Sequence, residues 1–222
     1  MPAIVPDLQR TEVAIVEMTN AFRKENGLGE VKPNAALAAA ARAFAQYLAR
    51  TGKFAHEADG REPHDRAAEQ GYRYCLVAEN LALNLDSRGF ESRKLAQGVV
   101  EGWKESPGHR ANLLQAGATE IGVGVARAPD KHPKFISVQL FGRPEALKVT
   151  FEIENRSGAS VRYRLGNHTQ DLAPRTIARH AHCGLEPLSF ETATPARFDP
   201  RDGDRFLLRG AAGAVKVDVQ RK

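Results

Sequence analysis

Six residues near the middle of the chain constrain its fold more than any others, because branched and bare positions alternate along them. Residues 121–126 read Ile, Gly, Val, Gly, Val, Ala. Alternation with a period of two predicts a β-strand, and its glycines leave one face on which a helix or another backbone can sit closely. Residues 135–141 predict a partner strand, reached across a turn at Pro129-Asp130.

Four helices are predicted upstream of these strands, from apolar residues at helical spacing and from residues typical of helix ends. Asn34 is a good N-cap for an alanine-rich segment, and Gly52 can close that segment. Helices first and strands after predict an α+β domain of stacked layers. The helices cover residues 8–22, 34–52 and 63–70, and a segment with Leu95, Val99 and Trp103 that has Asp86 and Ser87 as candidate caps and Pro107 as its stop.

After residues 142–146 the pattern changes to short strand candidates separated by turn signals such as Gly166-Asn167. Short strands at close spacing predict a small antiparallel β-sandwich or barrel. We therefore expect a first domain of mixed helices and strands over residues 1–143 and a small all-β domain over 147–222. The strand candidates are residues 147–153, 160–165, 176–183, 188–191, 205–208 and 214–219.

Composition argues against two kinds of partner. The net charge of +5 is spread over interleaved charges with 7% aromatics, whereas a nucleic-acid interface gathers its cations on one stripe. No apolar run approaches the roughly 18 residues of a membrane span, and the first residues lack the basic and apolar regions of a signal peptide. Cys75 and Cys183 either form one disulfide or are two buried thiols.

Residues 103–114 combine a buried-type aromatic, a helix stop and three polar site candidates in the sequence Trp-Lys-Glu-Ser-Pro-Gly-His-Arg-Ala-Asn-Leu-Leu. Four other motifs accompany it: Phe-Ala-His at 54–56, Ala-Glu-Asn at 78–80, the alternating segment at 121–126 and Gln-Leu-Phe-Gly at 139–142. Their order and spacing resemble the bacterial branch of the CAP superfamily, also called the SCP or PR-1-like domain, over residues 8–143. The resemblance implies an α/β/α sandwich with a concave cleft, in a secreted or periplasmic protein.

Members of that family often place two His and two Glu in the cleft. His56 matches the first His, and Glu79 matches the Glu of the Glu-Asn motif. The other two positions depart from the eukaryotic pattern, because Ser106 and Ile136 stand where Glu and His are common, and the bacterial pattern offers His109 instead. The residues that the resemblance places in the cleft are His56, Glu79, Asn80, Ser106, His109, Arg110, Asn112 and Gln139.

The chemistry of these side chains leaves several roles open. His56 and His109 could bind zinc together with a carboxylate, since neutral imidazole and carboxylate form a common zinc ligand set. A hydrolase would use Glu79 as general base with either His as acid, or Ser106 as a nucleophile activated by His109. No third group that would orient the Ser-His pair is identifiable. The structural alternative is a polar network that pins the loop around His109.

Four of the cleft candidates also have ordinary structural interpretations. Asn80 and Asn112 are expected to hydrogen-bond the backbone of loops. Arg110 could hold an anionic ligand with two donors, although an Arg at a helix end is more often a surface or salt-bridge residue. Gln139 points towards the cleft if the resemblance holds, and is otherwise a solvated strand residue. Trp103 is expected in the core.

The last third of the chain carries a second polar cluster. His180 and His182 lie two residues apart and so project from one face of a strand. Two His without nearby carboxylates make a poor metal site, and a solvated strand face is expected. Residues 199–204 read Asp-Pro-Arg-Asp-Gly-Asp, which lacks the closing Glu of a calcium loop and predicts a turn.

The leading hypothesis is therefore a binding or scaffold protein rather than an enzyme, with a polar cleft for a small ligand, a cell-envelope component or a protein. A hydrolase of peptide or cell-envelope substrates, with or without zinc, is the second hypothesis. Lipid or sterol binding is the third, and it needs an apolar pocket of at least ~300 Å³.

Overall fold

The computed structural model describes residues 3–184, 186–192 and 194–221. Its contacts divide the chain into two compact units, one that ends at Ala146 and one that starts at Leu147. The first unit mixes helices with a sheet, and the second is built from strands. A single 3₁₀ turn, η1 (Glu145–Leu147), spans the division. Within the described ranges, no helix is long and apolar enough to cross a membrane.

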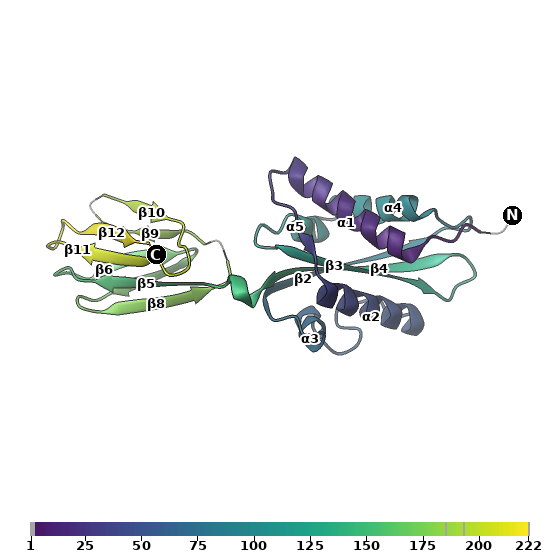
Figure 1. The fold of residues 1–222 in the computed structure, drawn as a ribbon, viewed down its shortest axis with the longest axis horizontal. Helices are drawn as coiled ribbons and strands as arrows, with labels where there is room; N and C mark the ends of the chain where they lie inside the picture. The colour runs from purple at the N-terminus through teal and green to yellow at the C-terminus, as the bar shows by residue number, and fades with distance from the viewer. Residues whose placement is uncertain (1–2, 185, 193, 222) are drawn as a thin grey trace. The chain divides into compact units, whose positions relative to one another are not determined.

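The first unit is an α/β/α sandwich around one four-stranded sheet, which confirms the predicted layers (Figure 1). The pairing of β1 with β3 is parallel, and the other two pairings are antiparallel. In order across the sheet, the strands are β1 (Lys32–Pro33), β3 (Glu120–Ala128), β4 (Lys134–Pro144) and β2 (Tyr74–Leu85). One face is covered by α1 (Leu8–Glu25), α4 (Ser92–Glu105) and α5 (Pro107–Leu113), and the other by α2 (Ala35–Thr51) and α3 (Pro63–Glu69).

Helix α2 has the ends that its sequence predicts. The Asn34 side chain accepts hydrogen bonds from Ala36 N at 2.9 Å and from Leu37 N at 3.2 Å, which satisfies two amides of the first turn. At the other end Gly52 takes a φ of +70°, the left-handed conformation of a helix C-cap. The helix then lies on the bare face of β3, where a Cβ added at Gly122 would collide with the α2 backbone. The alternation in the sequence therefore sets how closely this helix and the sheet approach.

The first unit differs from the prediction in several places, and strand β1 and helix α5 were not predicted. Strand β2 pairs with β4 over its whole length with one irregularity near its start, although no strand was predicted there. Asp86 and Ser87 therefore follow a strand and cap no helix, and α4 begins only at Ser92. Pro107 ends α4 as predicted, and it also stands at the first position of α5, where its missing N–H costs nothing.

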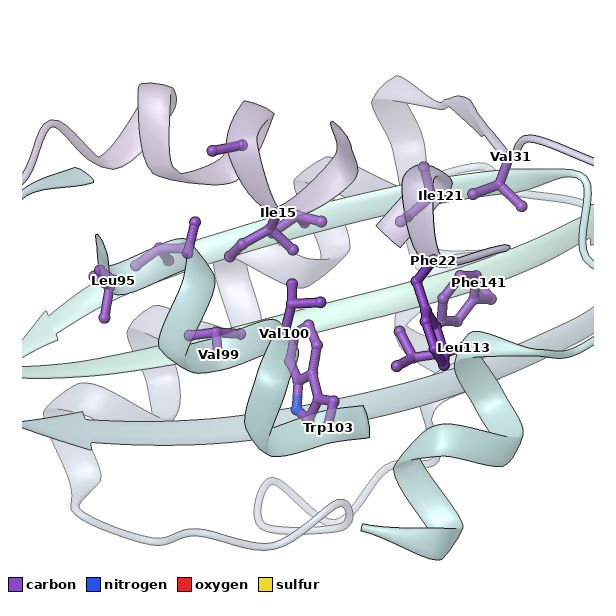
Figure 2. Packing of buried hydrophobic residues seen from close by; sticks show 14 of the residues in the cluster. Ile15, Phe22, Val31, Leu95, Val99, Val100, Trp103, Leu113, Ile121 and Phe141 are labelled. Atoms are coloured by element: carbon purple, nitrogen blue, oxygen red, sulfur yellow. The ribbon is translucent and has the colours of Figure 1, made fainter. Parts of the chain in front are cut away.

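The tryptophan of α4 lies in the core, as predicted. Trp103 is 1% exposed and belongs to the apolar cluster that α1, α4 and α5 form against the sheet (Figure 2). Its indole Nε1 donates a hydrogen bond to Leu81 O on β2 at 2.9 Å, so that burial leaves no unpaired donor. A second cluster, which includes Phe44 and Leu48, fills the space between the sheet and α2. The sheet is thus packed on both faces.

The second unit packs two four-stranded sheets around one shared core. Phe151 and Phe206 of one sheet meet Tyr163 and Phe190 of the other in that core. The expectation of purely antiparallel pairing is wrong, because β5 (Val149–Asn155) and β11 (Arg205–Arg209) run parallel. Two short strands, β7 (His168–Leu172) and β10 (Ala196–Phe198), were not predicted. One sheet contains, in order, β10 (Ala196–Phe198), β9 (Leu188–Phe190), β6 (Val161–Leu165) and β7 (His168–Leu172), and the other β12 (Lys216–Gln220), β11 (Arg205–Arg209), β5 (Val149–Asn155) and β8 (Ile177–His182).

The sequence left open whether Cys75 and Cys183 form a disulfide or are two reduced thiols, and the structure decides between these alternatives. Cys75 and Cys183 are both disulfide-bonded, and no free cysteine occurs among the residues that the structure describes. The interpretation as two reduced, separately buried thiols is therefore wrong.

Candidate functional site

A histidine and a buried glutamate meet at the outer edge of the first unit's sheet. Glu79 lies in the middle of β2, and its side chain is 1% exposed. His56, from the segment between α2 and α3, brings Nδ1 to 2.8 Å from Glu79 Oε1. Because an ionised carboxylate can only accept hydrogen bonds, Nδ1 carries the shared proton. The imidazole itself remains 51% exposed, so Nε2 is the nitrogen left for a ligand.

A buried arginine holds the same glutamate from the other side. Arg66, on α3, donates from Nη2 to Glu79 Oε2 at 2.9 Å and from Nη1 to Asp59 Oδ1 at 2.9 Å. Its guanidinium also stacks over the Phe44 ring, 3.6 Å from the centroid. Both carboxylate oxygens of Glu79 are therefore engaged, one by His56 and one by Arg66. This fixes the orientation of the His56 ring before any ligand arrives.

The two imidazoles of the site are shifted in opposite directions. The hydrogen bond to Glu79 raises the pKa of His56 above its ordinary value of 6.5. Burial lowers the pKa of His109 below that value, and the positive charge of a protonated His56 lowers it further. The structure thus brings the two histidines within electrostatic reach of one another and favours protonation of His56 over protonation of His109.

The residue after Glu79 faces the other side of the sheet, because side chains alternate along a strand. Asn80 is fully buried, and its Nδ2 donates to Gln139 Oε1 at 3.0 Å and to His109 O at 3.2 Å. Asn112, on α5, donates to Asn80 Oδ1 at 2.9 Å and to Glu79 O at 3.0 Å. These bonds fasten α5, and with it His109, to β2.

The asparagines behave partly as predicted, and the glutamine does not. Asn80 and Asn112 each bond a backbone carbonyl as expected, but they lie on a strand and a helix instead of on loops. Gln139 is fully buried and donates from Nε2 to Thr19 Oγ1 at 2.9 Å. It therefore supports the Asn80 network from inside the core and faces neither a cleft nor solvent. Both expectations for Gln139 were wrong for this reason.

Two further candidates lie at and near the start of α5 without forming a catalytic pair. Ser106 is the N-cap residue of α5, and its hydroxyl makes no capping hydrogen bond. Arg110 is exposed, and its guanidinium lies 5.1 Å from the centroid of the Phe22 ring, a cation–π contact instead of an anion site. Among the described contacts nothing joins Ser106 to His109, so the geometry offers no activated nucleophile.

A metal site is not assembled from these groups. Nowhere in residues 3–184, 186–192 and 194–221 do three or more His, Cys, Asp or Glu side chains gather in an arrangement that could hold a metal ion. Of the two predicted ligands, His56 contacts Glu79, whose carboxylate is already bonded to Arg66. Zinc fits the residues of this site poorly.

The histidine pair of the second unit is half-buried and packs on the core, whereas a solvated strand face was expected. His180 and His182 lie on the face of β8 that turns to the core, where both rings contact Phe151, with centroids at 5.1 Å and 5.6 Å. The Tyr163 hydroxyl lies 2.9 Å from His180 Nε2 and bonds Gln170 Oε1 at 2.6 Å. Burial lowers the pKa of His180. These contacts give the pair a structural role.

Residues 199–204 contain the predicted turn, in which Gly203 takes a φ of +81°.

Sequence reasoning missed three residues that hold the site together. Arg66 and Asp59 fix Glu79 and the segment that carries His56, and Thr19 supports Gln139 from α1. A buried arginine has no local signal that separates it from a solvated one. Only the short helix start at Pro63, which sets the position of Arg66, was visible in advance.

These observations define a class of protein: a three-layer domain whose paired His and Glu stand at the outer edge of its sheet. The model of the cysteine-rich secretory protein family, CAP, matches residues 16–141. The chain belongs to this family, and the resemblance found in the sequence motifs is confirmed.

Two relatives from Bacillus subtilis strain 168 share this region. The uncharacterized protein YkwD is 33% identical over 114 residues, which are 51% of this chain and 41% of YkwD. The uncharacterized membrane protein YlbC is 29% identical over 118 residues, which are 53% of this chain and 32% of YlbC. The chain therefore matches less than half the length of either relative.

Solved structures share the same fold. An extracellular protein with an SCP domain from Bacillus anthracis strain Ames superposes with a TM-score of 0.51 at 26% identity, over 61% of this chain and 41% of that one. An outer surface protein from Borrelia burgdorferi gives a TM-score of 0.52 at 23% identity, over 62% of this chain and 96% of that one. The second likeness is one of fold alone.

Proposed function

We propose that this chain is an exported, secreted or periplasmic, binding protein whose CAP domain holds its ligand at a cleft formed by His56, Glu79 and His109. The ligand is a component of the cell envelope or a segment of another protein. Export is supported by the extracellular SCP-domain protein of Bacillus anthracis, whose fold the chain shares. The second unit then serves to present the CAP domain to a surface or partner.

The observation that carries this proposal is the double engagement of Glu79. One oxygen accepts from His56 at 2.8 Å and the other from Arg66 at 2.9 Å. A general base must be able to take a proton from a substrate, and a metal ligand needs a free oxygen. The Glu79 side chain has a partner on each oxygen and is 1% exposed, so it offers little access to a substrate proton or a metal ion, while it orients an imidazole well. The arrangement therefore favours recognition through His56 Nε2 over acid–base catalysis.

A specific observation also keeps the lipid hypothesis as a second candidate. A groove of about 510 Å³ is lined by residues of α1, α2 and β3 along the β3 edge of the sheet, among them Val13, Val16 and Val123. That volume exceeds the ~300 Å³ expected of a small-ligand pocket. It lies away from the His-Glu pair, so the two candidates are separable by mutation.

Titrating the protein with zinc chloride by calorimetry tests the proposal against the metal-dependent hydrolase. We expect neither the wild type nor His56→Ala to bind zinc tightly and stoichiometrically. Tight one-to-one binding that disappears in His56→Ala, together with hydrolysis of a peptide or peptidoglycan substrate, would replace the binding protein with an enzyme.

A nuclear magnetic resonance titration tests ligand binding itself. Two probes are added separately, a muramidase digest of peptidoglycan and a pool of random decapeptides, while the imidazole signals are observed. The His56 and His109 signals should shift with one probe, while that of His132, in the turn between β3 and β4, stays in place. Shifts at His132 alone, or at no imidazole with either probe, contradict the proposed cleft.

A further inference from the structure

Strand β2 is an edge strand of the sheet, and its own hydrogen bonds reveal which residues turn their backbone outward. The carbonyl of Glu79 accepts from Asn112 Nδ2 at 3.0 Å, and that of Leu81 accepts from Trp103 Nε1 at 2.9 Å. At the end of the strand, Asp86 N turns inward to Pro133 O at 3.2 Å. Backbone groups of alternate residues point to the same side of a strand. The odd-numbered residues of β2 therefore face the open edge.

Two residues of that edge lie beyond the caps. Leu83 and Leu85 continue the outward series, and the pairing with β4 stays regular through both. In the described part of the chain no strand pairs with β2 on this side. Leu83 and Leu85 are 44% and 48% exposed, so two apolar side chains lie at the surface beside the outward backbone groups. Natural proteins blunt such edges with charges, prolines or bulges, and none of these stands at residues 81–85.

We propose that the open edge of β2 at Leu83 and Leu85 takes an extended peptide segment of a partner protein as an added strand. The segment carries apolar side chains at alternate positions, which pack on the two leucines, and an acidic group that reaches the imidazoles. This inference rests on the proposed function and names the class of its ligand.

The geometry gives each part of such a peptide a partner. Main-chain hydrogen bonds to the edge would supply affinity, and the alternate side chains would supply specificity. Four residues separate Leu83 from Glu79, a distance of about 13 Å along a strand. A peptide paired with Leu83 and Leu85 cannot pair with the capped carbonyls of Leu81 and Glu79. If it continues in that direction, it comes near His56 after a few residues. A carboxylate there would accept a hydrogen bond from Nε2–H of His56 in its protonated form, the form that the bond between Nδ1 and Glu79 favours.

A second copy of the chain fits this edge less well than a peptide. Stable interfaces between folded proteins engage about 20–30 residues on each side. Among the described residues of this edge, only Leu83 and Leu85 offer outward backbone groups past the two capped carbonyls. The ion pair between Asp86 and Arg88 lies directly after them. A single extended segment needs no more than the width of one strand.

Selection from a phage-displayed library of random decapeptides tests the proposal. The probe is the most enriched peptide, synthesised and titrated against the full chain. Leu83→Lys should weaken its binding at least about tenfold, which corresponds to ~1.4 kcal/mol. Ile177→Lys is the matched control, because Ile177 is a 46% exposed apolar residue on a strand of the second unit, β8, and it should leave the affinity unchanged.

A scan with N-methylated peptides supplies a readout that does not depend on protein variants. Methylation should abolish binding at every second position and be tolerated at the positions between, because only alternate amides face the strand. Equal losses at consecutive positions overturn the added strand. Binding that His56→Ala abolishes but Leu83→Lys leaves intact also overturns it, while the proposed cleft survives. The proposal is also overturned if no peptide is enriched on the wild type relative to a parallel selection on Leu83→Lys. A concentration-dependent dimer that Leu83→Lys converts to monomers would overturn it as well.

Discussion

The two edges of the CAP sheet differ in how their outward backbone N–H and C=O groups are paired. At the β3 edge, the short strand β1 pairs with the first residues, and farther along Glu12 Oε1 accepts from Val125 N at 3.0 Å. Arg42 holds that carboxylate with two bonds of 2.9 Å and 2.7 Å to Oε2. At the β2 edge, Trp103 and Asn112 cap two carbonyls, and the strand beyond is bare.

Within one sheet, one edge is closed by structural contacts and the other carries the proposed cleft. A buried side chain can close an edge strand as well as another strand does, provided that every exposed amide finds an acceptor. The β3 edge is closed in this way and carries none of the residues of the proposed cleft at His56, Glu79 and His109. The β2 edge is closed only where the imidazoles need a fixed platform, and the paired His56 and Glu79 stand at that point.

The largest effect is expected from the arginine that fixes the β2 side. Arg66→Ala removes the buried cation that Glu79 and Asp59 share and leaves Glu79 with His56 and Asp59 with Arg61, and breaking a buried pair costs about 3–5 kcal/mol. Urea unfolding measures this loss. The matched control is Arg73→Ala, whose side chain is 85% exposed in its pair with Glu145 and which should cost no more than about 1 kcal/mol. Equal losses for the two variants would mean that Arg66 has no special role.

A smaller loss is expected from opening the closed edge. Glu12→Ala removes the acceptor of Val125 N, and a buried donor left unsatisfied costs about 1–3 kcal/mol. Hydrogen exchange of the Val125 amide should accelerate along with the drop in the free energy of unfolding. Glu17→Ala on the same helix, in an exposed pair with Arg93, should leave both quantities nearly unchanged. An unchanged Val125 exchange rate in Glu12→Ala would show that the edge is closed by something else.

Replacing the indole cap tests the half-closed edge. Trp103→Phe keeps an aromatic ring in the core but removes the bond to Leu81 O, and we expect a loss of about 2 kcal/mol from the unpaired carbonyl and the smaller ring. Thermal unfolding gives the magnitude. Deeper access to the edge should also broaden the signals of Leu81 and Leu83 in amide spectra. A variant as stable as the wild type would deny the indole its capping role.

The smallest effect is a pH dependence of stability. The folded-state pKa of His56 is raised by Glu79, with Glu62 adding to the rise and Arg66 opposing it. Its contribution to stability is therefore complete below the unfolded value of 6.5 and is lost as pH rises through the folded pKa. His109, whose pKa is lowered, acts in the opposite sense. The stability lost in His56→Ala should be larger at about pH 5 than at about pH 9, and the reverse order would contradict the pairing with Glu79.

Local signals in the sequence predicted the frame of the molecule and left out what fixes the site. Asn34, Gly52 and the glycines of β3 act through neighbours in the chain or through one close approach, so their roles were readable. Arg66 and Gln139 gain theirs from partners 13 and 120 residues away. Strand β2 was missed because its polar Glu-Asn pair interrupts an apolar run that tertiary pairing, and not local propensity, holds extended.

The protonation of the two imidazoles tests the central claim, that Glu79 holds His56 by Nδ1 and leaves Nε2 for a ligand. Long-range ¹H–¹⁵N spectra recorded across a pH titration give the tautomer and the pKa of each ring. The account predicts that His56 titrates above 6.5 and His109 below it, that neutral His56 is protonated on Nδ1, and that Glu79→Gln brings the His56 pKa down. A His56 that titrates at or below His109, or that Glu79→Gln leaves unmoved, would contradict it.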